Sequence, residues 1–268
     1  IAPIVCFIVT VILAVLFIYP VYFAVISAFK SNGEILKAPL AFPTELYLQN
    51  FKDLFAKTDF FTAIWHTVFL TVVSEVLIIL VVPLSAYAIE RHKSKATKFV
   101  YAYFTAGMMI PFHLYMFPLF KEMKVFHIYG TLWGPVICYI AGSVAFGTLL
   151  YTSFLKGVPI DIEEAAKIDG AGEWQVFSRV CMPQCRAALY SIAILVFIDY
   201  WNMVEQPIVL LPDAEKQPLS VYLSTINTGE VGLAFAIATI YMVPTLLLFL
   251  HGEEYLVEGI ATQGSVKG

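Results

Sequence analysis

The sequence predicts an all-α membrane protein with six transmembrane helices. Of its 268 residues, 60% are hydrophobic and only 13% are charged, whereas soluble domains carry about 25% charged residues. The mean hydropathy is +0.80. Charge-poor runs of about 20 residues or more, the length that an α-helix needs to cross the hydrocarbon core, also recur along the chain. Strands of a membrane β-barrel would instead be about 10 residues long with alternating polarity.

The six predicted spans are runs with few or no charged residues. The first run ends before Lys30, which is the first charge in the chain, and no small-residue cleavage site follows it. We therefore interpret it as a span and not as a signal peptide. Because the chain begins with Ile1, we expect a few residues to precede it. The runs predict a single transmembrane domain over residues 1–268, with spans at about 3–29, 62–89, 99–120, 132–155, 187–211 and 231–250.

Six spans place both termini on one side of the membrane. The short loop over residues 90–98 concentrates positive charge, which is typical of a cytoplasmic loop. Its basic residues are Arg91, Lys93, Lys95 and Lys98. Counted over all loops, nine basic residues lie on this side and seven on the other, so the bias resides in the short loop alone. We predict that both termini are cytoplasmic.

A polar segment, residues 159–186, separates the fourth and fifth predicted spans. Asp161 stands where a helix N-cap belongs, and Glu164 follows three residues later in a near capping-box pattern. Gly170 then predicts a left-handed turn that ends this short helix. Small residues between Glu164 and Gly170 would let another backbone approach closely. The segment is therefore predicted to form an exposed knob.

A second short helix, residues 174–180, is expected to end at Pro183. One interpretation of the knob is an amphipathic segment that rests on lipid headgroups. An anionic membrane surface would repel its acidic side chains, so docking of a soluble partner is the better interpretation. The five acidic residues are Asp161, Glu163, Glu164, Asp169 and Glu173.

The residues of the knob resemble a known signature. Glu-Ala-Ala, a glycine after three more residues and a hydrophobic-x-hydrophobic-Pro closing are typical of permease subunits of bacterial ABC importers. Here the pattern consists of Glu164, Ala165, Ala166, Gly170, Val180, Met182 and Pro183. Val180 and Met182 replace the more usual Ile and Leu. Trp201-Asn202 and the C-terminal residues are also similar to carbohydrate-importing permeases, among them the smaller maltose-transporter permease.

The resemblance implies a mechanism with several partners. The knob would be a coupling helix that sits in a cleft of a cytoplasmic ATPase, and two ATPase subunits, a second permease and an extracytoplasmic solute-binding protein would complete the importer. ATP and Mg would bind the partner ATPase, because this chain has no G-x-x-x-x-G-K-[ST] phosphate loop and no cofactor site of its own. The residues implied in coupling are Glu164, Ala165, Ala166, Asp169, Gly170 and Pro183.

Polar and aromatic residues in the fifth span form a candidate translocation pathway. Aromatic faces stack on sugar rings, and carboxylates and amides bind hydroxyl groups. The alternative is that the intramembrane carboxylates pair with neighbouring spans without touching substrate. His113 has the same two interpretations, and packing is the simpler one. The fifth-span candidates are Asp199, Tyr200, Trp201, Asn202 and Glu205.

The sequence predicts a permease subunit of an ATP-driven sugar importer in the bacterial inner membrane. A net charge of −4 argues against a nucleic-acid partner, and the histidines show no metal-ligand spacing. The alternatives are the same mechanism with a non-sugar solute, or a membrane enzyme acting on a lipid-linked sugar. The enzyme would use Asp199, Glu205 and Glu75 as acid and base groups, and it leaves the Glu-Ala-Ala spacing unexplained.

Overall fold

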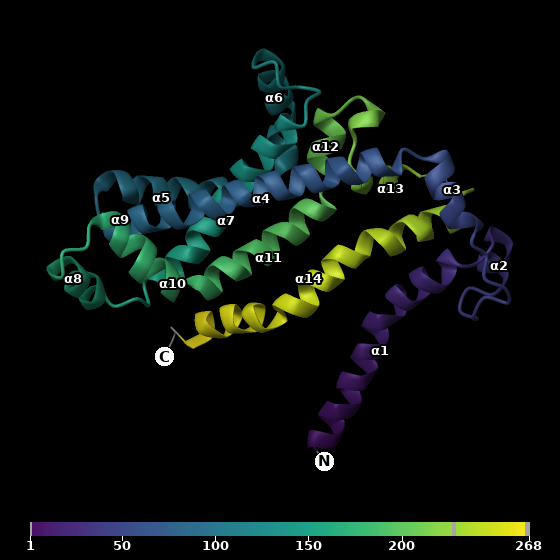
Figure 1. Cartoon of the computed structure of the whole chain (residues 1–268), viewed down its shortest axis with the longest axis horizontal. Helices are drawn as coiled ribbons and strands as arrows, with labels where there is room; N and C mark the ends of the chain where they lie inside the picture. Colours follow the sequence, from purple (N-terminus) through teal and green to yellow (C-terminus); the bar gives the residue numbers. More distant parts are fainter. Residues whose placement is uncertain (1, 227–228, 266–268) are drawn as a thin grey trace.

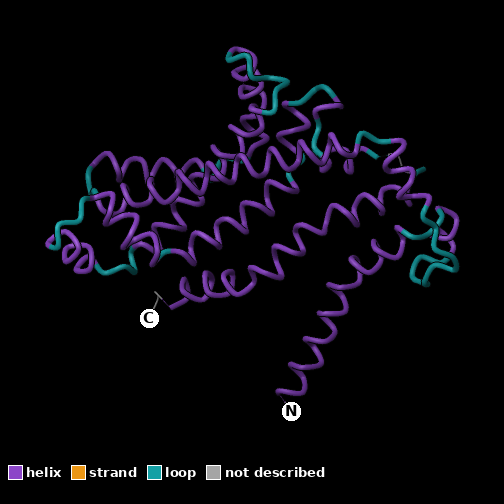
Figure 2. The backbone as a smooth tube through the Cα atoms, viewed as in Figure 1, coloured by secondary structure: helices purple, strands orange, loops and turns teal. Residues whose placement is uncertain are grey.

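Residues 2–226 and 229–265 are described in the computed structural model, and all regular secondary structure within them is helical (Figure 2). Long helices form the body of the protein (Figure 1). They are α1 (Ala2–Ala28), α4 (Phe60–Arg91), α7 (Trp133–Leu155), α11 (Arg186–Asn202) and α14 (Val231–Ser265). Among the described residues, Pro3–Ala28, Phe60–Arg91, Trp133–Leu155 and Val231–Glu253 are each long and apolar enough to cross a membrane. These helices support a multi-pass membrane protein.

The core lies where α4, α7 and α11 pack together. Buried aliphatic side chains such as Ile78 and Val82 of α4 face Leu155 of α7 and Ile192 of α11. Gly147 lets α7 approach α4 closely, because a Cβ atom there would lie 2.8 Å from a Val82 methyl group. Small residues at such contacts are the usual way in which membrane helices pack.

The predicted third span is two short helices rather than one. Helix α5 (Lys95–Gly107) ends before a turn, and α6 (Phe112–Val125) starts after Pro111 and points away from the bundle (Figure 1). Pro111 has no backbone N–H and disfavours helical geometry at Ile110, so the helix cannot continue through this point. Residues 99–120 carry no charge, which predicts a span, but the absence of charge does not reveal a break in the backbone.

The predicted fifth span is also broken. Helix α11 ends at Asn202, Met203 is extended with ψ 128°, and α12 (Glu205–Leu210) follows. At its other end the span is bent. Two consecutive helical segments, Glu173–Gln184 and Arg186–Asn202, are together long and apolar enough to cross a membrane, but they meet at an angle of 73°. The described residues therefore hold four candidate spans, or five with this bent pair. The prediction of six is not confirmed.

The two ends of the bundle carry different small elements (Figure 1). At one end lie α2 (Asn32–Lys37), α3 (Gln49–Lys57), η2 (Ala214–Lys216) and α13 (Leu219–Thr225). At the opposite end lie α8 (Ile160–Ile168), α9 (Glu173–Val176), η1 (Phe177–Cys181) and α10 (Met182–Gln184). This second set contains the predicted knob.

Helix α1 contacts the bundle only near its C-terminal end. Phe23 packs edge-on against Phe235 of α14, with ring centroids 5.1 Å apart, and residues 3–20 are exposed. The N-terminal part diverges from α14 (Figure 1). Helix α14 itself runs on to Ser265, beyond the predicted end at 250.

Candidate functional site

The first helix of the knob starts two residues earlier than the sequence indicated. Pro159, not Asp161, is the N-cap of α8, with φ −59° and ψ 133°. Proline's fixed φ suits the residues around a helix start, and it has no N–H to satisfy there. Asp161 lies in the first turn, where its negative charge complements the helix N-terminus. The predicted capping box is therefore wrong.

The turn after α8 is the one that Gly170 predicts. Gly170 has φ +90°, a conformation that costs residues with a Cβ about 1–2 kcal/mol. Asp169 caps the helix, and the N–H of Ala171 donates to the carbonyl of Ala166 at 2.9 Å. A Cβ at Gly170 would meet nothing within 4 Å, so the backbone conformation and not lack of space requires glycine.

Most of the predicted coupling residues are exposed on the knob. Glu164, Ala165, Asp169 and Gly170 are exposed on and just after α8, and Pro183 is exposed on α10. Ala166 is half-buried and packs against the bundle core. Helix α8, on which most of them lie, is at one end of the molecule (Figure 1).

The two most exposed apolar side chains of the knob were not among the predicted coupling residues. Ile168, at the end of α8, is 86% exposed, and Trp174 of α9 is 66% exposed. Large apolar side chains in a polar loop are the signal that could have found them, since an interface core is enriched in such residues. They flank the Gly170 turn.

The knob is attached to the bundle by an ion pair that the sequence did not reveal. Glu163 is only 4% exposed, and its Oε1 accepts from Nε of Arg91 at 2.7 Å. Arg91 is the last residue of α4. In the sequence Arg91 is one of four basic residues of a short loop, and no spacing links it to an acid 72 residues away.

A second attachment lies one helical turn earlier in α4. The Tyr87 hydroxyl donates to Oε2 of Glu173 at 3.2 Å, and its ring contacts Phe177 with centroids 5.2 Å apart. Lys167 Nζ donates to the other oxygen of Glu173 at 2.7 Å, which raises the pKa of Lys167. Both short helices of the knob are thus tied to α4.

The break between α11 and α12 borders an open cavity. Asp199, Asn202 and Glu205 line it, and its volume is about 410 Å³. Nε2 of His113, from the start of α6, lies 3.7 Å from Oε1 of Glu205. Both side chains are exposed. Irregular backbone in a membrane protein lines cavities or is buried in protein.

Two of the five fifth-span candidates are packed inside the chain. The Tyr200 hydroxyl donates to the carbonyl of Tyr139 at 2.7 Å, and these two rings stack with centroids 4.8 Å apart. Nε1 of Trp201 donates to the carbonyl of Tyr241 at 3.1 Å. The structure brings three candidates together at the cavity and places the other two in the core.

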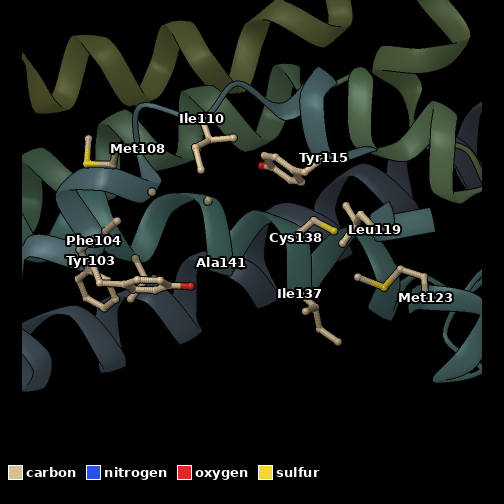
Figure 3. A pocket seen from close by; sticks show the side chains of 14 residues that line it. Tyr103, Phe104, Met108, Ile110, Tyr115, Leu119, Met123, Ile137, Cys138 and Ala141 are labelled. Carbon is tan, nitrogen blue, oxygen red and sulfur yellow. The ribbon is translucent and has the colours of Figure 1, made fainter. Parts of the chain in front are cut away.

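A larger apolar pocket lies between α5, α6 and α7 (Figure 3). Its volume is about 650 Å³. Tyr103 and Phe104 of α5 line one end, Tyr115 of α6 lies across from them, and Cys138 and Ala141 of α7 form the floor (Figure 3). Its lining residues include no charged side chain.

Comparison with known proteins identifies the family. The family described as "Binding-protein-dependent transport system inner membrane component" matches residues 82–252, which include the knob and the α11–α12 break. The chain belongs to this family. It is therefore a membrane transport subunit and not itself an enzyme.

Several permease proteins are similar to this chain along nearly its whole length. The chain is 30% identical over 260 residues to "Probable starch degradation products transport system permease protein AmyC" of Thermoanaerobacterium thermosulfurigenes, covering 96% of this chain and 94% of that protein. It is 28% identical to "Diacetylchitobiose uptake system permease protein NgcG" of Streptomyces coelicolor, covering 95% and 85%. It is also 28% identical to "Lactose transport system permease protein LacG" of Rhizobium radiobacter, covering 95% and 92%.

Proposed function

We propose that this chain is the permease subunit of an ATP-driven importer of di- or oligosaccharides. The observation that supports this most strongly is the knob, which is tied to the bundle through Glu163 and Glu173 but leaves its tip exposed. Three similar permeases are named for starch products, diacetylchitobiose and lactose. These substrates are built from more than one sugar unit.

In the proposed mechanism the knob is the coupling element. Ala165 and Gly170 let the ATPase backbone approach, while Glu164 and Asp169 supply polar contacts. Ile168 and Trp174 add apolar area on either side of the turn. Pro183 marks the end of the segment before the bend at Cys185. When the ATPase subunits close on ATP, they would displace α8 together with the helix ends to which it is attached.

The proposed pathway runs past the break between α11 and α12. Asp199, Asn202 and Glu205 present carboxylate and amide groups at an open cavity, and these groups suit sugar hydroxyls. His113 joins this set through its contact with Glu205. Tyr200 and Trp201 would support the pathway wall from inside the bundle and not contact substrate.

The proposed assembly includes a second permease, two cytoplasmic ATPase subunits and an extracytoplasmic solute-binding protein, all within or beside the bacterial inner membrane. The family's description supports the binding protein. ATP and Mg would be bound by the ATPase subunits. With six spans both termini would be cytoplasmic, on the same side as the knob.

The experiment that tests this function is ATPase activity of the reconstituted importer, with its binding protein, across a panel of solutes. We expect stimulation by an oligosaccharide such as lactose, diacetylchitobiose or a maltodextrin. Stimulation by a non-sugar solute alone would keep the coupling mechanism and reject the sugar. Failure of any ATPase to co-purify would reject the coupling mechanism as well.

A further inference from the structure

Arg91 joins three separate elements at one end of the bundle. It is the last residue of α4, and its Nε donates to Glu163 of α8 at 2.7 Å. Its Nη2 donates to the backbone carbonyls of Leu155 and Val158 at 3.0 Å and 3.1 Å. The Leu155 carbonyl lies at the end of α7 and also accepts from the N–H of Val158 at 3.1 Å, and the Val158 carbonyl lies in the turn that follows. The guanidinium therefore bridges α4, α7 and α8.

This bridge is the buried polar contact of helix α8. Glu163 is the one buried residue in α8, all of whose residues are described. The α8 helix has nine residues, which is too short to be stable alone in water. An apolar contact can slide, whereas a charged hydrogen bond at 2.7 Å fixes distance and direction. The buried Glu163–Arg91 contact therefore fixes both the distance and the direction between α8 and the end of α4.

The segment that connects the knob to α11 is less regular than the contact with α4. Between α9 and α11 it passes through the π-helical turn η1 and bends by 73° at Cys185. Such interruptions often mark places where helices move relative to each other. Force applied to α8 would therefore reach α4 and α7 through Arg91 more directly than it would reach α11 through the backbone.

We propose that Arg91 is the positioning residue through which movement of the knob is transmitted to α4 and α7. This inference rests on the proposed function, because it assumes that an ATPase displaces α8. Arg91 does not contact ATP or substrate in this account. It holds the Glu163 carboxylate, the last carbonyl of α7 and the Val158 carbonyl in the turn after α7 at the same time, so α4, α8 and the end of α7 move as one body.

The chemistry of the side chain makes the proposal specific to arginine. Its planar fork supplies several N–H groups in fixed directions, while a lysine ammonium is a single point donor on a flexible stem. Lysine at this position would keep the positive charge but could not hold the carboxylate and both carbonyls in the same geometry. Charge alone is therefore not sufficient.

The test compares variants in the complete importer, reconstituted in liposomes with its ATPase subunits and binding protein. Arg91→Lys keeps the charge, and Glu163→Gln keeps the shape of the acidic side chain. The measured quantity is solute uptake per ATP hydrolysed. We expect each variant to lower this ratio by about fivefold or more, which is the smallest change that typical coupling free energies between two sites produce. The ATPase subunits should still co-purify.

Lys93→Ala is the matched control. Lys93 lies two residues beyond Arg91, its side chain is 68% exposed, and it pairs only loosely with Glu90 at 3.9 Å. Exposed pairs of this kind contribute little, so the wild-type ratio is expected. The double variant Arg91→Glu with Glu163→Arg should recover part of the ratio lost in Arg91→Glu alone, which a general loss of folding would not produce.

Three results would overturn the proposal. One is a wild-type uptake ratio in both Arg91→Lys and Glu163→Gln. Another is an equal loss in Lys93→Ala. The third is failure of every Arg91 and Glu163 variant to assemble, which would assign the bridge a folding role alone. Absence of ATP-dependent uptake by the wild-type importer would instead reject the proposed function itself, so the two failures are distinguishable.

Discussion

At the scale of single residues, Gly170 shows most directly how backbone conformation shapes the knob. Its φ of +90° turns the chain sharply between α8 and α9, and open space surrounds the place of a Cβ atom. Only the conformation is restrictive. A β-branched residue pays the full penalty of that conformation, whereas asparagine adopts the left-handed region more readily than other residues.

Gly170→Val is expected to reduce uptake per ATP hydrolysed while membrane insertion and the amount of protein stay unchanged. The strain is about 1–2 kcal/mol, enough to redirect a short exposed turn but small against the buried core. Gly170→Asn is the matched control and should retain most of the coupling. The ratio is measured in liposomes, and normal coupling in the valine variant would contradict the role of the turn.

Ile168→Ser is expected to weaken binding of the ATPase subunits. Ile168 is 86% exposed, so the change removes no buried contact within this chain. Truncation of one of the few interface side chains that dominate binding costs about 2 kcal/mol or more. Co-purification of the ATPase and its affinity for the permease are the measurements. Leu36→Ser is the control, because Leu36 is 78% exposed on α2 at the opposite end. Equal effects of the two changes would contradict a docking surface on the knob.

At the scale of elements, α11 separates packing from candidate substrate contacts. Tyr200 and Trp201 donate hydrogen bonds to α7 and α14, whereas Asp199 and Asn202 face the open cavity. Adjacent residues on one helix thus point to opposite surroundings. Variants of the cavity residues should therefore affect solute uptake, and variants of the buried residues should affect stability.

Asp199→Asn is expected to raise the KM for solute uptake with little change in thermal stability. Loss of one hydrogen bond of about 1 kcal/mol corresponds to a several-fold change. Tyr200→Phe should do the reverse: it removes the hydroxyl that donates to the Tyr139 carbonyl, lowers the free energy of unfolding by about 1 kcal/mol and keeps the same KM. The two quantities are measured side by side by uptake and thermal unfolding. A change in KM for Tyr200→Phe alone would contradict this division.

Element positions also show what the sequence could predict. Hydrophobic length located α1, α4, α7 and α14, because a single long helix needs only a continuous apolar run. It failed for α5 and α6, where Pro111 interrupts an uncharged run, and at Met203 in the fifth span. Charge counts do not register such breaks in the backbone.

The candidate site was predicted to a different degree. The Gly170 turn follows from a local rule on glycine at helix ends, and the structure has it. The Arg91–Glu163 bridge joins residues far apart in the sequence, and only the packing of α4 against α7 brings them together. Burial of Tyr200 and Trp201 likewise depends on neighbouring helices that no local pattern specifies.

At the scale of the whole molecule, the two ends of the bundle are suited to different partners. One end presents the knob, which is rich in acidic side chains and tied to α4. The other end carries α2, α3 and α13 (Figure 1). Between the two ends, much of α1 is exposed and the pocket beside α5 is open, and both are apolar. Such surfaces are consistent with a chain that is covered by lipid and by partner subunits.

The central claim is that movement of the knob, driven by ATP, carries a sugar past the α11–α12 break. The most direct test is simultaneous measurement of labelled oligosaccharide uptake and ATP hydrolysis in liposomes containing the complete importer. The account predicts that uptake requires ATP and the binding protein together, and that both rates rise with the same oligosaccharide. Uptake that continues without ATP, or hydrolysis that no oligosaccharide stimulates, would contradict it.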